Sequence, residues 1–416
     1  MTDRHLPLTP LYNETRRGLY LSVNGKDSYT PEELIAMIFG HAKEITHAYG
    51  EEKGNTYGTI QDCVLTVPSF ATQVERQALL DAAELADMHV LGLIDENTAA
   101  ALNFGMDKLN EEPQIILFYN LGASSLQVSL VKFHTYGIPE GKYSKKNKTV
   151  GSIEVLAKAW DATLGGQEFD NLLVEYMADH FNREWRHARG HEKDVRDVPR
   201  AMTKMRLQAN KVKHVLSANQ QIPIHMDSVH DDMPLSLHIT REQLEDLCND
   251  LYARSVKPVT QVLAMANVTL DEVTAIEMIG GAMRVPKVQA ELSKALGDKE
   301  LGLHINSDES MALGAAFYGA NISTAFRVRH VGLTDINPFP VGISLSNLAT
   351  EEKKGFFGGG KKKDDSEEEE EWNKSASMFK AGGKTGVKKT IAFTHDKDVH
   401  CAVDYEDSVQ FPEGTQ

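Results

Sequence analysis

The stretch that decides the fold is QIILFYNLGASSLQVSLVKF, residues 114–133. Two runs of mostly apolar residues flank the short polar corner NLGASS (120–125). Such runs around a glycine-containing corner predict a β-hairpin. Backbone amides at a turn of this kind can approach an anion such as phosphate. The alternative, which the stretch alone leaves open, is plain sheet structure without a ligand.

The residues before this hairpin alternate between strand and helix patterns. IQDCVLTVP (60–68) and VLGLI (90–94) are short apolar runs typical of buried strands. The pattern between them predicts a helix whose buried face carries Val74, Ala78, Ala82 and Leu85. DENTAAALNFG (95–105) predicts a second helix that ends at its glycine. Strand–helix alternation of this kind indicates an α/β fold.

The residues after the hairpin predict a loop over 134–150 and a helical region over about 166–217. Within that region RHARGHEKDVRDVPR (186–200) is expected to be a solvated polar connection. Thr240 with Gln243 forms a capping box for a helix expected to bury Leu244, Leu247 and Leu251. AIEMIGG (275–281) predicts a strand leading into a helix with Pro286 in its first turn.

The last part of the chain has the alternating pattern of exposed β-structure. VGISLS (341–346) predicts a strand, and KTIAFTH (389–395) with VHCAVDY (399–405) predicts a hairpin around Asp396–Asp398. Between them, EEKKGFFGGGKKKDDSEEEEEWNKS (351–375) is rich in like charges and glycine. Such a segment cannot bury a core, so we expect a disordered acidic loop over about 350–376.

Composition places the chain among soluble globular proteins and excludes several functions. Of 416 residues, 41% are hydrophobic and 25% are charged, and the net charge is −16. This acidic balance argues against nucleic-acid binding. No apolar run approaches the length of a membrane span, and the first residues have no secretory signal.

Cysteines and histidines do not form a metal pattern. Cys63, Cys248 and Cys401 lie far apart and are interpreted as buried or free thiols. His187 and His191 have the spacing of metal ligands, but their charged surroundings favour solvent exposure, and we predict no metal site of protein ligands alone. Five Asn-x-Ser/Thr sequons favour the secretory pathway without establishing it: Asn13, Asn147, Asn267, Asn321 and Asn373.

Four separate segments share small residues at the junctions of strands with turns or helices. They are NLGASS (120–125), LGGQEFD (164–170), NKVKHVLS (210–217) and IGGAMRVPK (279–287). Each alone is a weak indication, because a Gly-Gly pair is more often a packing or turn feature. Together, their order and spacing indicate a single anion-binding site.

With these segments the chain resembles the seventy-kilodalton heat-shock chaperones, the DnaK family. VLTVPSFATQVERQALLDAAELADMHVLGLIDENTAAALNFGMDK (64–108) is similar to the family's Val-Pro strand through Asn-Glu-Pro-Thr-Ala-Ala-Ala, and the hairpin resembles its second phosphate loop. The resemblance covers about residues 18–325. It implies an actin-like (ribonuclease H-like) ATPase fold that binds ATP or ADP, with Mg²⁺ if bound.

Finer features resemble the large endoplasmic-reticulum branch of this family, the hypoxia-up-regulated chaperones. RDVPRAMTKMRLQANKVKHVLSAN (196–219) carries this likeness. The resemblance implies a nucleotide-binding domain over 1–325, a linker over 326–336 and a truncated substrate-binding β-sandwich domain over 337–416. The family's first phosphate loop has no counterpart, so we expect the ATPase domain to lack its first segment.

The resemblance also implies roles for particular residues. Glu96 corresponds to an acid that arranges metal and water, although it could instead be a helix N-terminal acid. Arg284 corresponds to an arginine that stacks on adenine, although it could be a surface arginine. The remaining implied nucleotide contacts are Gly122, Ala123, Ser124, Ser125, Lys213, Ser217, Gly280 and Gly281.

Several positions depart from the family pattern. Asn120 and Gln127 stand where the family has aspartates, and a carboxamide has neither the charge nor the basicity of a carboxylate. On the adenosine side, Asn210 replaces a glutamate and His214 replaces an arginine. We therefore expect ATP hydrolysis to be weak or lost in this chain.

Three functions remain to be compared. The family role is an ATP-driven chaperone for unfolded polypeptide clients in the endoplasmic-reticulum lumen, with a cytoplasmic location as the alternative. The second is a non-catalytic nucleotide-exchange partner, or a holdase, for a standard heat-shock chaperone. A sugar-kinase-type enzyme on the same fold is more distant, because the chaperone-like segments argue against it.

Overall fold

The computed structural model describes most of the chain in two compact units. The described residues are 10–15, 18–23, 25–54, 58, 60–106, 112–139, 147–190, 192–297, 299–323, 328–347, 373–393, 398–406 and 409. The larger unit is Thr2–Leu333 and the smaller is chiefly Thr334–Gln416. The range 326–336, expected to be a linker, includes strand β13 (Val331–Thr334).

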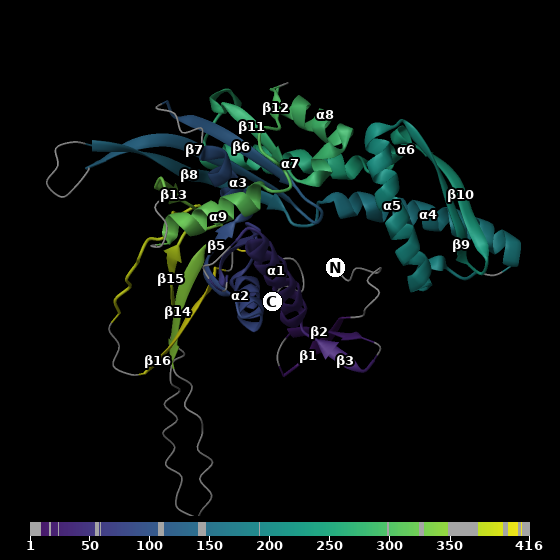
Figure 1. Cartoon of the computed structure of the whole chain (residues 1–416), viewed down its shortest axis with the longest axis horizontal. Coiled ribbons are helices and arrows are strands. Elements are labelled where there is room, and N and C mark those ends of the chain that lie inside the picture. Colours follow the sequence, from purple (N-terminus) through teal and green to yellow (C-terminus); the bar gives the residue numbers. More distant parts are fainter. Residues whose placement is uncertain are drawn as a thin grey trace, which may run out of the picture. The chain divides into compact units, whose positions relative to one another are not determined.

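A six-stranded sheet forms the centre of the larger unit (Figure 1). The strand order is β12 (Leu301–Gly302), β11 (Ala275–Ile279), β6 (Gln114–Leu121), β7 (Leu126–Pro139), β8 (Asn147–Asp161) and β13. β6 and β7 are antiparallel, with Leu121 opposite Leu126, so the predicted hairpin is confirmed. β11 runs parallel to β6 on its other side.

The expected loop over 134–150 is wrong at both of its ends. β7 continues to Pro139 and pairs with β8 from Asn147, in register Pro139↔Asn147. The polar residues of this region led to the prediction of a loop. The strands form nevertheless, because backbone pairing in a long antiparallel ribbon does not require buried side chains. Residues 140–146 lie outside the described part.

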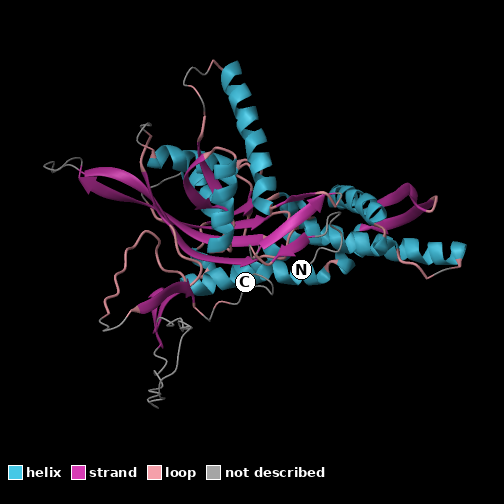
Figure 2. Cartoon of the chain, turned by 90° about the horizontal axis from the view of Figure 1, so that it is seen from below, coloured by secondary structure: helices cyan, strands magenta, loops and turns pink. Residues whose placement is uncertain are grey.

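Both faces of this sheet are covered by helices (Figure 2). Side chains alternate along a strand, so Leu117, Tyr119 and Leu121 enter one core with helices α4 (Gly166–Arg189), α5 (Pro199–Ala218) and α7 (Asn249–Ala266). Phe118 points to the opposite face, where its ring lies 5.7 Å from that of Phe104 in α3 (Glu96–Gly105). This two-sided burial explains why 114–133 is a nearly continuous apolar run.

A smaller parallel pair, β4 (Asp62–Val67) and β5 (His89–Asp95), confirms the two predicted strands. Helix α2 (Gln73–Leu85) lies between them in sequence, and its predicted buried face is confirmed at Ala82 but wrong at both of its ends. Val74 is 78% exposed and Leu85 is 61% exposed, whereas Ala82 and Ala83 are buried. The helix packs through its small residues, because alanines allow closer approach than a row of large side chains.

A small N-terminal sheet with the helix that follows it, and the last helix of the larger unit, are its remaining elements. A three-stranded sheet precedes helix α1 (Pro31–Glu52), which has no buried residue. Its strands are β1 (Pro10–Asn13), β2 (Gly18–Val23) and β3 (Asp27–Tyr29). Helix α9 (Ser310–Ile322) packs against α3 and β4. Among the described residues, no helix is both long and apolar enough to cross a bilayer.

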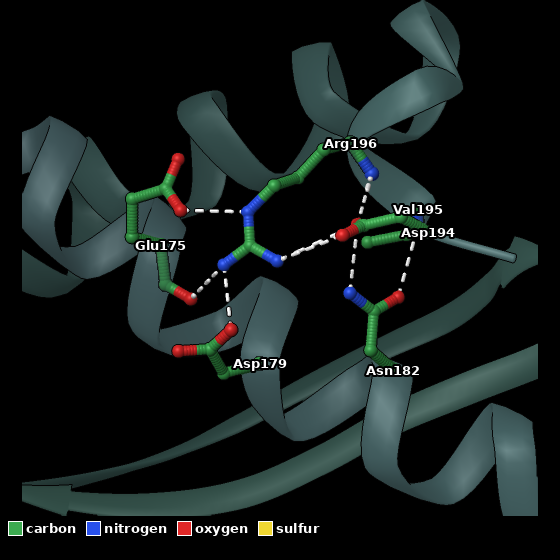
Figure 3. Close-up of polar contacts among 6 residues, drawn as sticks. All are labelled: Glu175, Asp179, Asn182, Asp194, Val195 and Arg196. Atoms are coloured by element: carbon green, nitrogen blue, oxygen red, sulfur yellow. Dashed lines mark hydrogen bonds and ion pairs between the residues drawn. The ribbon is translucent and has the colours of Figure 1, made fainter. Parts of the chain in front are cut away.

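The connection between α4 (Gly166–Arg189) and α5 (Pro199–Ala218) is more ordered than predicted. It contains the short helix η1 (Val195–Asp197), in which Val195 is fully buried, so a wholly solvated connection is wrong. Figure 3 shows the polar contacts among Glu175, Asp179, Asn182, Asp194, Val195 and Arg196. The Arg196 guanidinium bridges acids of α4 and of the connection, and this network folds the segment onto the helix.

The next segment is a two-stranded ribbon, β9 (Gln221–His230) with β10 (Met233–Thr240), followed by two helices. The capping box of Thr240 and Gln243 is confirmed. The single helix expected after it is wrong, because α6 (Arg241–Leu247) ends before α7 (Asn249–Ala266) begins. Leu244 and Leu251 are buried, but Leu247, beside the break, is 36% exposed.

The strand β11 leads through η3 (Gly281–Arg284) into α8 (Pro286–Ala295). Pro286 occupies the first turn of α8, as predicted. All three cysteines are free: Cys248 is buried, Cys63 is half-buried and Cys401 is exposed. The expectation of buried or free thiols is therefore confirmed.

The smaller unit contains a three-stranded antiparallel sheet with β14 (Val341–Asn347) between β15 (Asn373–Phe379) and β16 (Val399–Tyr405). The predicted hairpin between 389–395 and 399–405 is wrong. β16 pairs with β14, and residues 389–393 form no strand. Similar alternating patterns can pair in several ways, and sequence proximity favoured the wrong partner. Of the expected acidic loop, 350–372 lies outside the described residues and 373–376 belongs to β15.

Candidate functional site

A cavity of about 650 Å³ lies where all four predicted segments meet. The β6–β7 turn, the start of α4, one face of α5 and η3 form its walls. Six of the predicted site residues line it: Gly122, Ala123, Lys213, Ser217, Gly281 and Arg284. The other four, Glu96, Ser124, Ser125 and Gly280, are not among its lining residues.

The turn and the start of α4 are held together by backbone hydrogen bonds. The amide of Gly166 donates to the Gly122 carbonyl at 2.9 Å, and that of Gln167 donates to the Ala123 carbonyl at 2.8 Å. A Cβ at Gly165 would lie 2.4 Å from the Ala123 oxygen, so this approach requires glycine. These first amides of α4 therefore bind the protein's own carbonyls and are not directed at a ligand.

The two adjacent glycines at the junction of β11 and η3, Gly280 and Gly281, have different functions. Gly280 has φ +88°, and a Cβ there would lie 2.3 Å from the Leu121 carbonyl oxygen. It therefore allows the β11–η3 corner to pack against the end of β6. A Cβ at Gly281 would meet nothing within 4 Å, so this position is open and lines the cavity.

A buried charged group joins α4 to α5 in the cavity wall. Lys213 donates to the Gly166 carbonyl and to Asp170 Oδ2, both at 2.8 Å. Asn210 Nδ2 donates to the same carboxylate oxygen at 3.0 Å. The other oxygen, Asp170 Oδ1, is buried and has no hydrogen-bond partner among the described residues. Lys213 thus stabilises the wall, and Asp170 retains an acceptor.

Sequence reasoning had not identified Asp170 as a functional residue. Its position could have been inferred from LGGQEFD, because residues four apart share one face of a helix and Gly166 faces the cavity. Arg206 and Lys211, which also line the cavity from α5, were missed as well. The available indication was that α5 contains several basic residues and no acidic one.

Arg284 and Ser217 are the remaining residues that were predicted to contact adenosine. Arg284 Nη2 lies 3.2 Å from Asp308 Oδ2, and both side chains are 67% exposed. The guanidinium is therefore only loosely held at the cavity. Ser217 Oγ donates to the Lys213 carbonyl at 3.0 Å, a bond within α5 that a rotation of the hydroxyl can exchange.

The predicted acid Glu96 belongs to a separate polar cluster beside the hairpin. Gln127 Nε2 donates to Glu96 Oε2 at 2.6 Å, and the Asn120 side chain also hydrogen-bonds to Glu96. Burial raises the pKa of Glu96, opposed by the bond from Gln127. Next to it, the Lys158 ammonium lies 3.2 Å from Asp95 Oδ2, and both side chains are only 3% exposed.

The donor set of this cluster does not fit a magnesium ion. Mg²⁺ prefers carboxylate oxygens and water in octahedral geometry. Here the carboxylate of Asp95 is paired with an ammonium, and Glu96 is bound by two carboxamides. In the described part of the chain, no three His, Cys, Asp or Glu side chains gather closely enough to hold a metal. His187 is exposed, and His191 lies outside the described residues.

Comparisons with known proteins agree on one family. The model of the Hsp70 protein family matches residues 5–355. Heat shock 70 kDa protein 17 of Arabidopsis thaliana is 37% identical over 76% of this chain and 35% of its own length. Hypoxia up-regulated protein 1 of Danio rerio is 36% identical over 84% of this chain and 34% of its own length. Its counterpart in Xenopus laevis is 35% identical over 84% of this chain and 52% of its own length. The chain spans about a third to a half of the length of these relatives.

Proposed function

The chain belongs to the Hsp70 protein family, and on that premise we propose that it is an adenine-nucleotide-binding chaperone with weak or lost hydrolysis. The observation that carries the proposal is the cavity that joins four segments spread over more than 150 residues of sequence. Its volume is in the range typical of small-molecule sites, and polar groups are distributed around it.

The adenosine side of the cavity has suitable chemistry. The planar, exposed guanidinium of Arg284 can lie on a purine face. The open position at Gly281 lets a flat ring approach the backbone. The unpartnered Asp170 Oδ1 can accept a hydrogen bond from a sugar hydroxyl, which satisfies a buried acceptor that is costly to leave unpaired.

The phosphate side lacks what efficient phosphoryl transfer requires. That reaction depends on positioned cations and on a group that orients the attacking water. Asn120 and Gln127 supply carboxamides, both bound to Glu96, and the first α4 amides bind turn carbonyls. On the described part of this hairpin, positions 120 and 127 therefore present carboxamides rather than carboxylates that could accept a proton from the attacking water.

For the whole protein we propose a role in protein folding in the endoplasmic-reticulum lumen, with unfolded polypeptides as clients. The hypoxia up-regulated relatives support the branch. In this proposal the β14–β16 sheet belongs to the polypeptide-binding domain. The second candidate is a holdase or nucleotide-exchange partner of a standard heat-shock chaperone, which the carboxamides at Asn120 and Gln127 favour because such roles need no turnover.

Calorimetric titration with ADP and ATP, combined with a phosphate-release assay, tests the nucleotide proposal. We expect saturable binding with little or no phosphate release. Arg284→Ala should weaken binding about fivefold, the effect of losing one exposed cation–π contact. Arg183→Ala, an exposed arginine of α4 that does not line the cavity, is the matched control and should change nothing.

Three results would contradict parts of this proposal. Absence of saturable binding would remove the nucleotide role. Equal effects of the two arginine substitutions would place the ligand elsewhere. Phosphate release at rates typical of the family would show that the carboxamides do not limit hydrolysis. A client-aggregation assay run with and without ATP separates the holdase from an ATP-driven chaperone, because protection by a holdase does not depend on ATP.

A further inference from the structure

The charged side chains that line the cavity are unevenly distributed over its walls. The lysines and arginines among the lining residues all come from α5 and η3, the walls that were predicted to contact adenosine. The walls on the phosphate side, the hairpin and the start of α4, contribute Gly122, Ala123, Gly166, Gln167, Asp170 and Asn171. Among these lining residues the one charged side chain is a carboxylate.

A phosphate chain directed towards the hairpin would therefore gain little from this wall. Phosphates bind strongly where an ammonium, a guanidinium or a metal ion neutralises their charge. The lysine of the neighbouring cluster, Lys158, is paired with Asp95 at 3.2 Å. The amides of Gly166 and Gln167, at the start of α4, donate to carbonyls of the turn. The described lining residues of this wall thus include no cation that could compensate a phosphate.

Asp170 lies between the two sides of the cavity and has an unsatisfied oxygen. The residue is only 6% exposed, and its Oδ2 accepts from Lys213 at 2.8 Å and from Asn210 at 3.0 Å, both on α5. These two bonds fix the orientation of the carboxylate. Its Oδ1 is buried and has no hydrogen-bond partner among the described residues. A buried acceptor is costly to leave unpaired, so a ligand hydroxyl that reaches Oδ1 gains a strong hydrogen bond.

Building on the proposed adenine-nucleotide function, we propose that the cavity recognises the nucleoside part of its ligand, with Asp170 as the residue that selects for a sugar hydroxyl. The sugar of a nucleotide lies between base and phosphate, as Asp170 lies between α5 and the hairpin side. A carboxylate only accepts hydrogen bonds, so it favours a hydroxyl donor and disfavours a phosphate oxygen. The ligand class is therefore adenine ribonucleosides, to whose binding the phosphates contribute little.

The first test is calorimetric titration of the full chain with adenosine, AMP and ADP in the presence of Mg²⁺. We expect dissociation constants within about threefold of one another, because the phosphates meet no compensating cation on the hairpin side. ADP binding about tenfold or more tightly than adenosine would overturn this inference and leave the proposed nucleotide site intact. Absence of binding by all three ligands would overturn both, so the two failures are distinguishable.

The second test compares adenosine with 2′-deoxyadenosine and 3′-deoxyadenosine on the parent chain. At least one of the two analogues should bind about tenfold or more weakly than adenosine, because its sugar leaves the buried carboxylate oxygen without a donor. Equal binding of all three nucleosides would overturn the selection for a sugar hydroxyl. This comparison needs no variant, so it does not depend on the stability of a mutated protein.

The third test assigns the selection to Asp170. In Asp170→Ala, adenosine and the weaker analogue should bind within about twofold of each other, since the acceptor is removed. The readout is the ratio of two affinities on one protein, so a general loss of affinity does not imitate it. Asp250→Ala, which replaces an exposed aspartate of α7 outside the cavity, is the matched control and should keep the ratio of the parent chain. An unchanged ratio in a folded Asp170→Ala would overturn the assignment.

Discussion

The cavity and the polar cluster both border the β6–β7 hairpin, and their charged side chains are arranged in opposite ways. At the cavity, Lys211 and Arg284 are exposed to solvent and available to a ligand. In the cluster, Lys158 and Asp95 neutralise each other in a nearly dry environment. One hairpin can therefore present Gly122 and Ala123 to a cavity while Asn120 and Gln127, a few residues away, are buried in a polar cluster.

The largest expected effect comes from the buried ion pair. Lys158→Met should lower the free energy of unfolding by about 3–5 kcal/mol, because it leaves the Asp95 carboxylate buried without its cation. Denaturant titration followed by circular dichroism measures this loss. Lys158→Met combined with Asp95→Asn should recover part of it, since asparagine still caps α3 and carries no charge. A double variant less stable than the single one would contradict a role in charge compensation.

The next effect distinguishes two neighbouring glycines at the cavity. Gly280→Ala should destabilise by about 2 kcal/mol or more, because it adds a Cβ at positive φ and against the Leu121 carbonyl. Gly281→Ala is the matched control and should change stability by less than about 0.5 kcal/mol, since its Cβ meets open space. Thermal and denaturant unfolding measure both. Similar losses at the two positions would mean that the corner is not packed as described.

The smallest effect concerns pH and Glu96. Burial raises the pKa of Glu96, so the folded state binds this proton more tightly than the unfolded state does. The stabilisation from the protonated carboxyl is complete below the unfolded pKa of about 4.3 and is lost as pH rises through the higher folded pKa. Glu96→Gln should therefore gain stability relative to the parent chain as pH rises through this window.

Unfolding free energies measured from pH 4 to pH 7 provide the test. Glu84→Gln, which replaces an exposed acid of α2, is the matched control and should change the pH dependence less than Glu96→Gln does. If Glu96→Gln leaves the pH dependence of the unfolding free energy unchanged, the prediction is wrong. The hydrogen bonds from Asn120 and Gln127 would then fully offset the cost of burying the Glu96 carboxylate.

Local patterns predicted much of the fold because they depend on neighbours in sequence. The hairpin of 114–133, the strands on both sides of α2, the capping box at Thr240 and the proline at the start of α8 are all confirmed. The wrong predictions concern what a segment packs against. Val74 and Leu85 are exposed, and β16 pairs with β14, because other parts of the chain decide burial and pairing.

The predictions about the candidate site were likewise right where they depended on sequence order and incomplete where they depended on tertiary contacts. The order and spacing of four short segments, three of which contain glycine, predicted which segments meet, and the cavity lies where they converge. The sequence did not indicate that Lys213 is held by a carboxylate 43 residues away, nor that Glu96 lies outside the cavity. Such contacts depend on the angle and depth at which helices pack, which no short stretch of residues encodes.

Residue identity and local periodicity were sufficient to predict the α/β class, the β6–β7 hairpin and the carboxamides at positions 120 and 127. Which charges face a ligand and which neutralise one another depends on how the chain folds. The physical reason is distance: Coulomb interactions and hydrogen bonds act over a few ångströms, and only the folded chain brings Lys158 to Asp95 and leaves Lys211 open.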